Sequence, residues 1–317
     1  MNVLITGGMG NLGSRLLIPL VRRKYQVVLF DGRPDPLISS PEFEKTLYFE
    51  GDVTNLESII QAVHQHEIDV IFHLASLLSA QSERESNLAW EINMTGTRNV
   101  LEAARLGGVS RVTFSSSLAT YGPGIKEPLE IDAPMWPASL YGVTKVASEC
   151  LGNYYHLRFG MDFRSIRFPT LVAPRGASGA ASAFCSAIFV EAFEKGAFNF
   201  EVGPDATFPA IYIGDAIRAF LLLFDAPNER LSRRVYNVHG LGLSARELAN
   251  AVLRILPETN ITYTPNPTLS VIVDSWPQFI DDSMARIDWD WEADYDLDRM
   301  AIEIITQLRN RSYNENP

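Results

Sequence analysis

The chain has few cysteines and no long apolar run. Only two cysteines, Cys150 and Cys185, occur among its 317 residues, which is too few for a disulfide framework and lacks the paired spacing of a zinc site. We therefore expect a reducing, cytoplasmic setting and no bound metal. No stretch reaches the apolar length that crossing a bilayer requires, and the N-terminus has no basic region or cleavage site typical of a signal peptide. We expect no membrane partner.

Positive charge is also scarce. There are 27 Lys and Arg residues against 38 Asp and Glu residues, so the formal net charge is -11. Nucleic-acid binding depends on clustered basic side chains, and this balance argues against it. The hydrophobic fraction of 46% is that of an ordinary folded globular protein with a sizeable core. We expect the partner to be a small-molecule substrate.

The first half of the chain alternates short β-branched runs with helical patterns. Residues 3–6, 26–30, 70–73, 111–115 and 164–167 are typical of strands buried on both faces, and residues 12–23, 56–65, 88–106 and 139–158 carry apolar residues at helical spacing. This alternation predicts βαβ units and an α/β fold with a doubly wound, Rossmann-type parallel sheet.

The alternation breaks after residue 167. A stretch of small residues follows at 176–183, and residues 211–224 and 235–238 look like a return to the sheet before a helix at 244–255 and a proline-rich run at 257–277. We expect a Rossmann domain over residues 1–167, with 211–240 returning to it. Residues 168–210 and 241–317 would form a smaller, discontinuous substrate-binding lobe.

A glycine-rich loop follows the first predicted strand and opens the first predicted helix. Gly7, Gly10 and Gly13 are spaced by three residues. In this context the first glycine allows a tight turn, the second lets the backbone approach a pyrophosphate, and the third lets the helix pack closely against the sheet. The helix N-terminus then offers free N–H groups to the phosphates. The pattern predicts a dinucleotide site.

Two acidic residues follow later strand-like runs. Asp31 closes residues 27–31, where a carboxylate accepts hydrogen bonds from the adenosine ribose and repels a 2′-phosphate. The carboxylate therefore favours NAD. NADP remains the alternative, because the Arg33 side chain could bind its 2′-phosphate. Asp52, followed by Val53, is either an adenine contact or a plain helix cap.

Tyr141 and Lys145 are four residues apart on the predicted helix over residues 139–158, so both project from one face. An ammonium near a phenol favours the phenolate and lowers its pKa, which would make the tyrosine useful as a base. Hydroxyl side chains from Ser115 to Thr120 follow a buried strand and fall where ligands bind in an open α/β sheet. One hydroxyl would position the substrate oxygen, and others would satisfy backbone groups in a turn.

These features together resemble the extended short-chain dehydrogenase/reductase superfamily, which includes nucleotide-sugar epimerases, over essentially the whole chain. The resemblance implies that Ser117 is the catalytic hydroxyl, Tyr141 the acid/base, and Lys145 its activator, which also contacts the nicotinamide ribose. It implies that the segment 72–76 passes the cofactor and that Asn93 is a structural or relay residue. It also implies a homodimer through the helices over residues 88–106 and 139–158.

Within the superfamily the chain is most similar to the short-chain-type L-threonine 3-dehydrogenases, on the residues at 73–80, 89–94, 162–167, 274–277 and 281–283. This likeness makes Ser79 and Trp276 candidate substrate residues. One segment differs from the pattern of this family. Residues 178–184 stand where the family has a Gly-Gly-Gly-Thr-Thr-Asp-Tyr-like loop, and their sequence is more similar to that of dehydrogenases that act on sugar acids.

The expected site is thus as follows. The catalytic residues are Ser117, Tyr141 and Lys145. The cofactor-binding residues are Gly7, Gly10, Asn11, Leu12, Gly13, Asp31, Asp52, Val53, Leu74, Ala75, Ser76, Asn93, Ser115, Tyr141, Lys145 and Phe168. The substrate-binding residues are Ser79, Ser117, Thr120, Tyr141, Ser182 and Trp276.

The expected reaction is NAD-dependent oxidation of a secondary alcohol to a ketone, with L-threonine as the best candidate and 2-amino-3-oxobutanoate as its product. The alternatives are a nucleotide-sugar epimerase or dehydratase, a sugar-acid dehydrogenase, and a non-enzymatic NAD-sensing module. An intact set of Ser117, Tyr141 and Lys145 argues against the last.

Overall fold

The computed structural model describes residues 1–38, 40–176 and 180–315. Contacts divide the chain into two compact units. The first contains residues 1–121, 135–167 and 220–236, and the second contains residues 122–134, 168–219 and 237–317. Each unit is described by itself.

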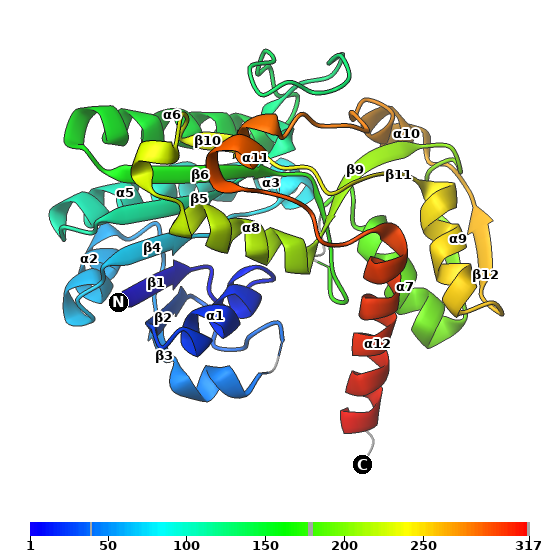
Figure 1. Ribbon diagram of the computed structural model, residues 1–317, viewed down its shortest axis with the longest axis horizontal. Coiled ribbons are helices and arrows are strands. Elements are labelled where there is room, and N and C mark those ends of the chain that lie inside the picture. The colour runs from blue at the N-terminus through cyan, green and yellow to red at the C-terminus, as the bar shows by residue number, and fades with distance from the viewer. Residues whose placement is uncertain (39, 177–179, 316–317) are drawn as a thin grey trace. The chain divides into compact units, whose positions relative to one another are not determined.

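A seven-stranded sheet forms the centre of the first unit (Figure 1). Its strands, in spatial order, are β10 (Val235–Asn237), β6 (Asp162–Phe168), β5 (Arg111–Ser117), β4 (Val70–His73), β1 (Asn2–Thr6), β2 (Gln26–Asp31) and β3 (Leu47–Glu50). From β5 through β4, β1 and β2 to β3 every pair is parallel. The order reverses between β1 and β4, so the predicted doubly wound α/β sheet is confirmed.

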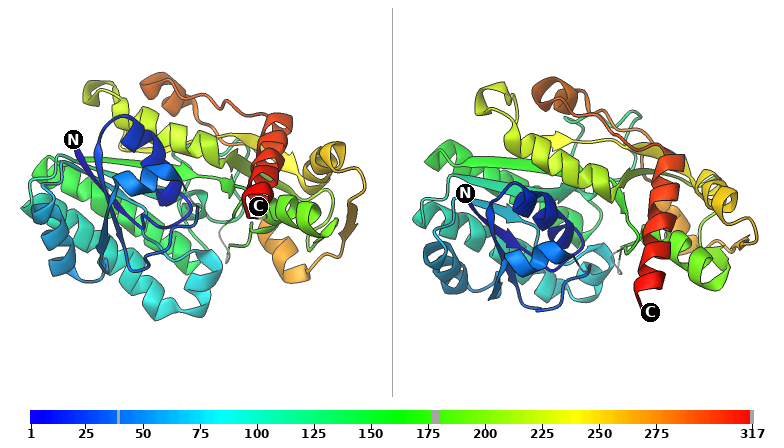
Figure 2. Two further views of the ribbon diagram at one scale, coloured as in Figure 1. Left: turned by 90° about the horizontal axis from the view of Figure 1, so that it is seen from below. Right: turned by 60° about the horizontal axis from the view of Figure 1, so that its bottom comes forward.

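Helices lie on both faces of this sheet (Figures 1 and 2). The helices of this unit are α1 (Gly13–Arg22), α2 (Leu56–Gln65), α3 (Ser79–Arg84), α4 (Ser86–Trp90), α5 (Gly96–Leu106), α6 (Leu140–Phe159) and the end of α8 (Ile213–Asp225), with 3₁₀ turns at η1 (Pro41–Lys45), η3 (Leu118–Thr120) and η4 (Asn228–Arg230). Alternation of side chains along each strand builds a separate core on each face. One face packs Leu4, Val28 and Phe114 with Val100 of α5. On the other, Phe72 contacts Phe220.

The helix predicted over residues 88–106 is interrupted. A π-helical turn, η2 (Glu91–Thr95), separates α4 from α5. Such turns widen a helix locally and re-aim its side chains, and they occur often at functional sites. Here the turn carries Asn93, which is 3% exposed.

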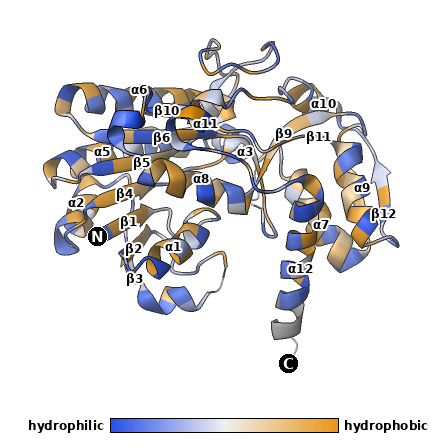
Figure 3. Cartoon of the chain, in the orientation of Figure 1, coloured by the Kyte–Doolittle hydropathy of each residue, from blue (hydrophilic) through white to orange (hydrophobic). Residues whose placement is uncertain are grey.

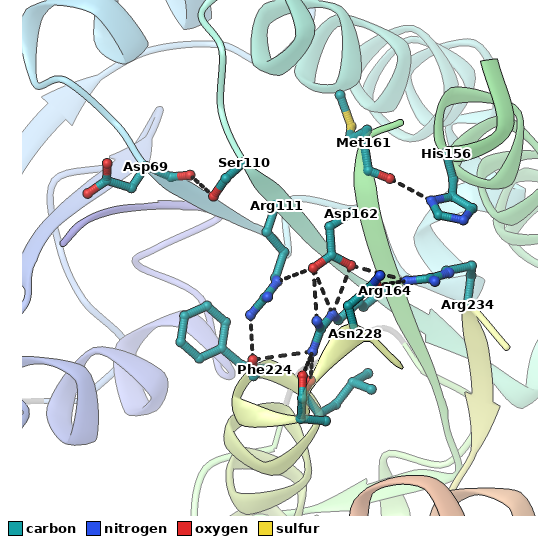
Figure 4. A network of polar contacts seen from close by, with 12 residues as sticks. Asp69, Ser110, Arg111, His156, Met161, Asp162, Arg164, Phe224, Asn228 and Arg234 are labelled. Carbon is teal, nitrogen blue, oxygen red and sulfur yellow. Dashed lines mark hydrogen bonds and ion pairs between the residues drawn. The ribbon is translucent and has the colours of Figure 1, made fainter. Parts of the chain in front are cut away.

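An ionic network around the buried Arg164 holds the start of β6 (Figure 4). Asp162 accepts hydrogen bonds from Arg111 at 2.6 Å and from Arg164 at 2.9 Å. Arg164 is fully buried and donates to the carbonyls of Leu223 and Ala226, where α8 (Ile213–Asp225) ends. A cation at a helix C-terminus satisfies carbonyls that have no partner within the helix. The network therefore has a clear structural role.

The second unit contains two small sheets. One has the order β11 (Leu241–Ser244), β9 (Thr207–Tyr212), β7 (Thr170–Val172), and the other pairs β12 (Asn260–Tyr263) with β8 (Ala197–Phe200). Its remaining helices are α7 (Phe184–Lys195), α9 (Ala245–Ile255), α10 (Pro267–Val273), α11 (Ser283–Trp289) and α12 (Leu297–Glu315). A capping box of Ser244 and Glu247 begins α9.

Of the segments expected to return to the large sheet, β10 pairs with β6 there, whereas residues 211–224 are mostly helix, because they form the end of β9 and then α8. Hydrophobic residues concentrate in the central strands, and helices such as α9 show one hydrophobic and one hydrophilic side (Figure 3). No helix in the described part of the chain is long and apolar enough to cross a membrane.

Candidate functional site

The loop between β1 and α1 forms a cradle of backbone groups. Gly7 has a φ of +69°, and a Cβ placed on it would lie 2.7 Å from the amide nitrogen of Ala75. A Cβ on Gly13 would lie 2.5 Å from the carbonyl oxygen of Gly7. Both positions therefore require glycine, one for its conformation and both for close packing of backbone.

The cradle fits a dinucleotide. A Cβ on Gly10 would meet only the carbonyl oxygen of Gly7, at 3.2 Å, so the loop surface beside it is open. At the start of α1 the N-cap is Leu12, and no side chain caps the helix there. Uncapped N–H groups at a helix N-terminus bind phosphate oxygens well. This loop, with Asn11 and Leu12, is therefore suited to a pyrophosphate.

Asp31 lies at the end of β2 and faces the same loop. Its carboxylate accepts hydrogen bonds from the amides of Met9 and Arg33, both at 3.1 Å. The Arg33 side chain forms an ion pair with it at 3.6 Å. The loop thus fixes the orientation of the carboxylate, as a contact to a ribose diol would require.

Asp52 and Val53, which follow β3, have different contacts. Asp52 accepts a hydrogen bond from the amide of Thr54 at 2.8 Å, whereas the N-cap of α2 is Asn55. The helix-cap interpretation of Asp52 is therefore wrong, because the chain makes a short turn before the helix begins. Val53 is 6% exposed and packs in the core, where it contacts Gly96.

Asn93 fastens the loop that follows β4. Its side-chain oxygen accepts from the amide of Leu77 at 2.8 Å and from the hydroxyl of Ser76 at 3.2 Å. Its amide group donates to the Leu77 carbonyl and to Thr144 on α6. The π-helical turn places Asn93 for this role, which holds the segment of Leu74, Ala75 and Ser76 beside the glycine loop.

His73, at the end of β4, is buried between two threonine hydroxyls. Its ring nitrogens lie 2.7 Å from Thr6 Oγ1 and 3.0 Å from Thr97 Oγ1. Burial lowers the pKa of His73 to about 3, and the nearby charge of Lys145 acts in the same direction. The imidazole is therefore neutral at physiological pH and ties β4 to β1 and α5.

The predicted catalytic groups come together at the end of β5 and the start of α6. Tyr141 hydrogen-bonds to the Ser117 side chain. Lys145 Nζ lies 5.3 Å from the centre of the Tyr141 ring and donates to the Ser115 carbonyl at 2.8 Å. A Cβ on Gly142 would lie 2.1 Å from the Ala119 carbonyl oxygen, so α6 meets the η3 turn in direct backbone contact.

The side-chain hydroxyls of Ser116, Ser117 and Thr120 have different hydrogen-bond partners. Ser117 accepts a hydrogen bond from the Ala119 amide at 3.1 Å and still reaches Tyr141. Thr120 is fully buried and donates to the Ser117 carbonyl at 2.9 Å. The Ser116 hydroxyl hydrogen-bonds to Glu149. Ser117 is therefore the hydroxyl that accompanies Tyr141, and Thr120 stabilises the turn.

The expected effect of Lys145 on Tyr141 is not what the structure shows. Burial raises the pKa of Tyr141 to about 12, and the hydrogen bond to Ser117 offsets only part of this. Burial lowers the pKa of Lys145 to about 7, with the Glu149 carboxylate acting in the opposite direction. The prediction of a lowered tyrosine pKa is wrong, because desolvation of the buried phenol dominates and the Ser117 hydrogen bond is what acts against it.

The other predicted residues lie farther along the chain. Ser79 begins α3, which is joined to α6 where Glu83 accepts a hydrogen bond from the Leu140 amide at 2.8 Å. Phe168, Ser182 and Trp276 belong to the second unit, at the end of β6, before α7 and after α10. Part of the divergent loop at 178–184 falls on residues 177–179, outside the described residues. Metal-binding groups of three or more His, Cys, Asp or Glu side chains are absent from the described part of the chain.

Sequence reasoning missed a buried ion pair beside these groups. Glu149 and Arg167 have side chains that are 3% and 6% exposed and pair at 2.8 Å. Glu149 is four residues after Lys145, so the helical spacing that connects Tyr141 with Lys145 also predicts its position. Arg167 is a charged residue in a strand that is otherwise buried, which is the second available signal.

Comparisons with known proteins agree with this geometry. Residues 3–238 match the model of the NAD dependent epimerase/dehydratase family. The chain is 37% identical to the mitochondrial L-threonine 3-dehydrogenase of Bos taurus over 97% of its own length and 82% of the relative. Among solved structures, the holo form of a GalE-like L-threonine dehydrogenase from Cupriavidus necator has a TM-score of 0.91 at 32% identity, covering 97% of this chain and all of that one. A monomeric L-threonine 3-dehydrogenase from a metagenome has a TM-score of 0.89 at 30% identity, covering 98% and 99%.

Proposed function

Because the chain belongs to the NAD-dependent epimerase/dehydratase family, we propose that it oxidises L-threonine to 2-amino-3-oxobutanoate with NAD as the oxidant. The observation that supports this most is the hydrogen-bonded Ser117 and Tyr141 pair with Lys145 behind it, at the carboxyl end of β5. The similarity of both units to proteins described as L-threonine dehydrogenases supports the choice of substrate.

We assign the binding of NAD to the first unit. The glycine loop and the first turn of α1 would hold the pyrophosphate, and Asp31 the adenosine ribose. These residues would hold NAD, which when bound would supply the hydride acceptor for the oxidation. Four further candidate residues lie outside this cradle. Phe168, in the second unit, is assigned to NAD. The substrate is assigned to Ser79 on α3 and to Ser182 and Trp276 in the second unit.

The chain's own residues handle the proton. Oxidation of a secondary alcohol breaks its O–H and C–H bonds, and Tyr141 Oη would accept the hydroxyl proton while Ser117 Oγ hydrogen-bonds the same substrate oxygen. A phenol with a pKa of about 12 is protonated at neutral pH and must lose that proton before it can act as a base. The rate of oxidation should therefore rise with pH. The positive charge on Lys145 would favour the Tyr141 phenolate and so help it to act as a base.

Substitution of Tyr141 tests the assignment. Tyr141→Phe removes the hydroxyl and keeps the ring, so turnover should fall by about 100-fold or more, as expected for loss of a general base. Affinity for NAD should stay within about threefold, because the glycine loop and Asp31 are untouched. A variant with unchanged turnover would remove Tyr141 from the reaction.

A nucleotide-sugar epimerase or a sugar-acid dehydrogenase is the second candidate. Its support is the segment at 178–184, which departs from the loop typical of threonine dehydrogenases. Purified protein should be offered L-threonine, other β-hydroxy amino acids, sugar acids and UDP-sugars in turn, with NADH absorbance as the readout. Formation of NADH with threonine alone supports the first proposal, and formation of NADH with a sugar acid supports a sugar-acid dehydrogenase. An epimerase regenerates its NAD in each cycle, so absence of NADH with every compound supports the epimerase.

We also propose a homodimer and a cytoplasmic location. Large apolar side chains are exposed on α4 and α6, at Trp90, Tyr154, Leu157 and Phe159. One similar structure is described as monomeric, so the mass in solution decides. Light scattering should give twice the mass of the chain, and Leu157→Glu should then give the single mass. Both cysteines are free, which is compatible with a reducing compartment and can be checked by cell fractionation.

A further inference from the structure

The buried ion pair of Glu149 and Arg167 lies next to the predicted catalytic groups but takes no part in the proposed chemical step. Arg167 donates through Nε to Glu149 Oε1 at 2.9 Å and through Nη2 to Oε2 at 2.8 Å, a two-point contact. Such a pair rarely adds net stability, because the cost of removing two charges from water is similar to what their attraction returns. Its presence here therefore calls for another role.

Each member of the pair reaches a segment that carries catalytic groups. Glu149 lies on α6, one turn beyond Lys145, and accepts a hydrogen bond from the hydroxyl of Ser116, the neighbour of Ser117. Arg167 donates to the hydroxyl of Tyr121 and lies with its guanidinium carbon 4.9 Å from the centre of that ring. The pair thus joins α6 to both ends of the segment at 116–121.

We propose that the Glu149–Arg167 ion pair is a positioning element, which holds the Ser117 hydroxyl against α6 at the distance that Tyr141 requires. This inference deepens the proposed function and rests on it. Glu149 and Arg167 are positioning residues, since they act through Ser116, Tyr121 and Lys145 and have no part in the chemical step.

The charge of Glu149 has a second consequence. The titratable and charged groups that interact with Lys145 are Tyr141 and Glu149 on α6 and His73 on β4, and Arg167 on β6 is paired with Glu149. Of these, Glu149 is the one that raises the pKa of Lys145 against the effect of burial. Removal of the carboxylate should lower that pKa further, so Lys145 would lose its charge at a lower pH.

The test compares a double variant with a matched control. Glu149→Met combined with Arg167→Met removes both charges and leaves neither unpaired, an exchange that buried pairs often tolerate. The control is Arg111→Met, which breaks the ion pair with Asp162 at the opposite end of β6 (Figure 4). Each protein is assayed for thermal unfolding, NADH binding by fluorescence, and kcat and KM as functions of pH.

We expect the double variant to fold and to bind NADH within about threefold of the wild type. Its kcat should fall by about 10- to 100-fold, as for a misplacement of catalytic groups by a fraction of an ångström to 1 Å, with KM little changed. The rise of kcat with pH should move to higher pH, because a Lys145 that loses its charge at a lower pH no longer favours the Tyr141 phenolate. Arg111→Met should lower the unfolding temperature without changing kcat or its pH profile.

Two results would overturn the inference. One is a folded double variant with wild-type kcat and pH profile. The other is an equal loss of kcat in Arg111→Met, which would make the effect one of general stability. Should the double variant not fold, Glu149→Gln and Arg167→Lys are judged by the same criteria. The comparison uses any substrate that the wild type turns over, so failure with threonine counts against the proposed function alone.

Discussion

Substitution of Gly142 tests how closely the catalytic hydroxyls depend on the contact between α6 and η3. In Gly142→Ala the new Cβ would lie 2.1 Å from the Ala119 carbonyl oxygen and 2.7 Å from Pro137 Cβ. Since real Cβ atoms essentially never approach other atoms within 3.0 Å, the helix start and the turn must separate by about 1 Å. Ser117 and Tyr141 lie on the two sides of that contact.

The expected loss is large in rate and modest in stability. A displacement of about 1 Å between reacting groups can lower the rate by about 100-fold. Overpacking costs about 1–3 kcal/mol, of which the better helix propensity of alanine returns up to about 1 kcal/mol. Initial rates of NADH formation and urea unfolding measure the two effects separately.

The same substitution elsewhere on α6 provides the control. In Gly152→Ala the Cβ would lie 2.2 Å from the Phe163 ring, a comparable clash far along the helix from Tyr141. This variant should lose stability and keep its kcat once folded. If Gly142→Ala kept the wild-type kcat, or if Gly152→Ala lost as much, the contact with η3 would have no specific role in catalysis.

Two further predictions concern His73 and Asp31. Burial lowers the pKa of His73 to about 3, below that of an unfolded histidine, so the unfolded chain binds the extra proton and stability falls as pH drops below about 6.5. The loss should be about 1.6 kcal/mol between pH 6.5 and pH 5, and His73→Asn should reduce it in urea unfolding at several pH values; an unchanged pH dependence would contradict the assignment. Asp31→Ser should raise kcat/KM for NADP relative to NAD by about tenfold or more, because the carboxylate that repels a 2′-phosphate is removed; an unchanged ratio would show that Asp31 does not face the ribose.

Local patterns predicted the first half of the fold well, for reasons that the structure makes clear. The helix α2 and the strand β4 lie where the periodicity places them, because each buries one continuous apolar face or run. The break in the helix over residues 88–106 was not predicted. Apolar spacing alone does not reveal a π-helical turn, whose position depends on the contacts of Asn93 with Leu77.

The composition of the candidate site was predictable and its electrostatics were not. Tyr141, Lys145 and Ser117 could be found from helical spacing, strand ends and family resemblance. The pKa of Tyr141 depends on burial, which one sequence does not display, and the expected direction was wrong. The pair of Glu149 and Arg167 escaped notice because its two signals, helical spacing from Lys145 and a charged residue in a buried strand, concern different elements. They point to one ion pair only once α6 packs against β6.

The most direct test of the central claim is the stoichiometry of NAD reduction during turnover of L-threonine. Threonine consumed and NADH formed would be quantified in the same reaction of the purified wild-type protein. We expect equal amounts of the two, because each oxidation transfers one hydride to NAD. Threonine left unchanged, or a substrate converted without accumulation of NADH, would contradict it.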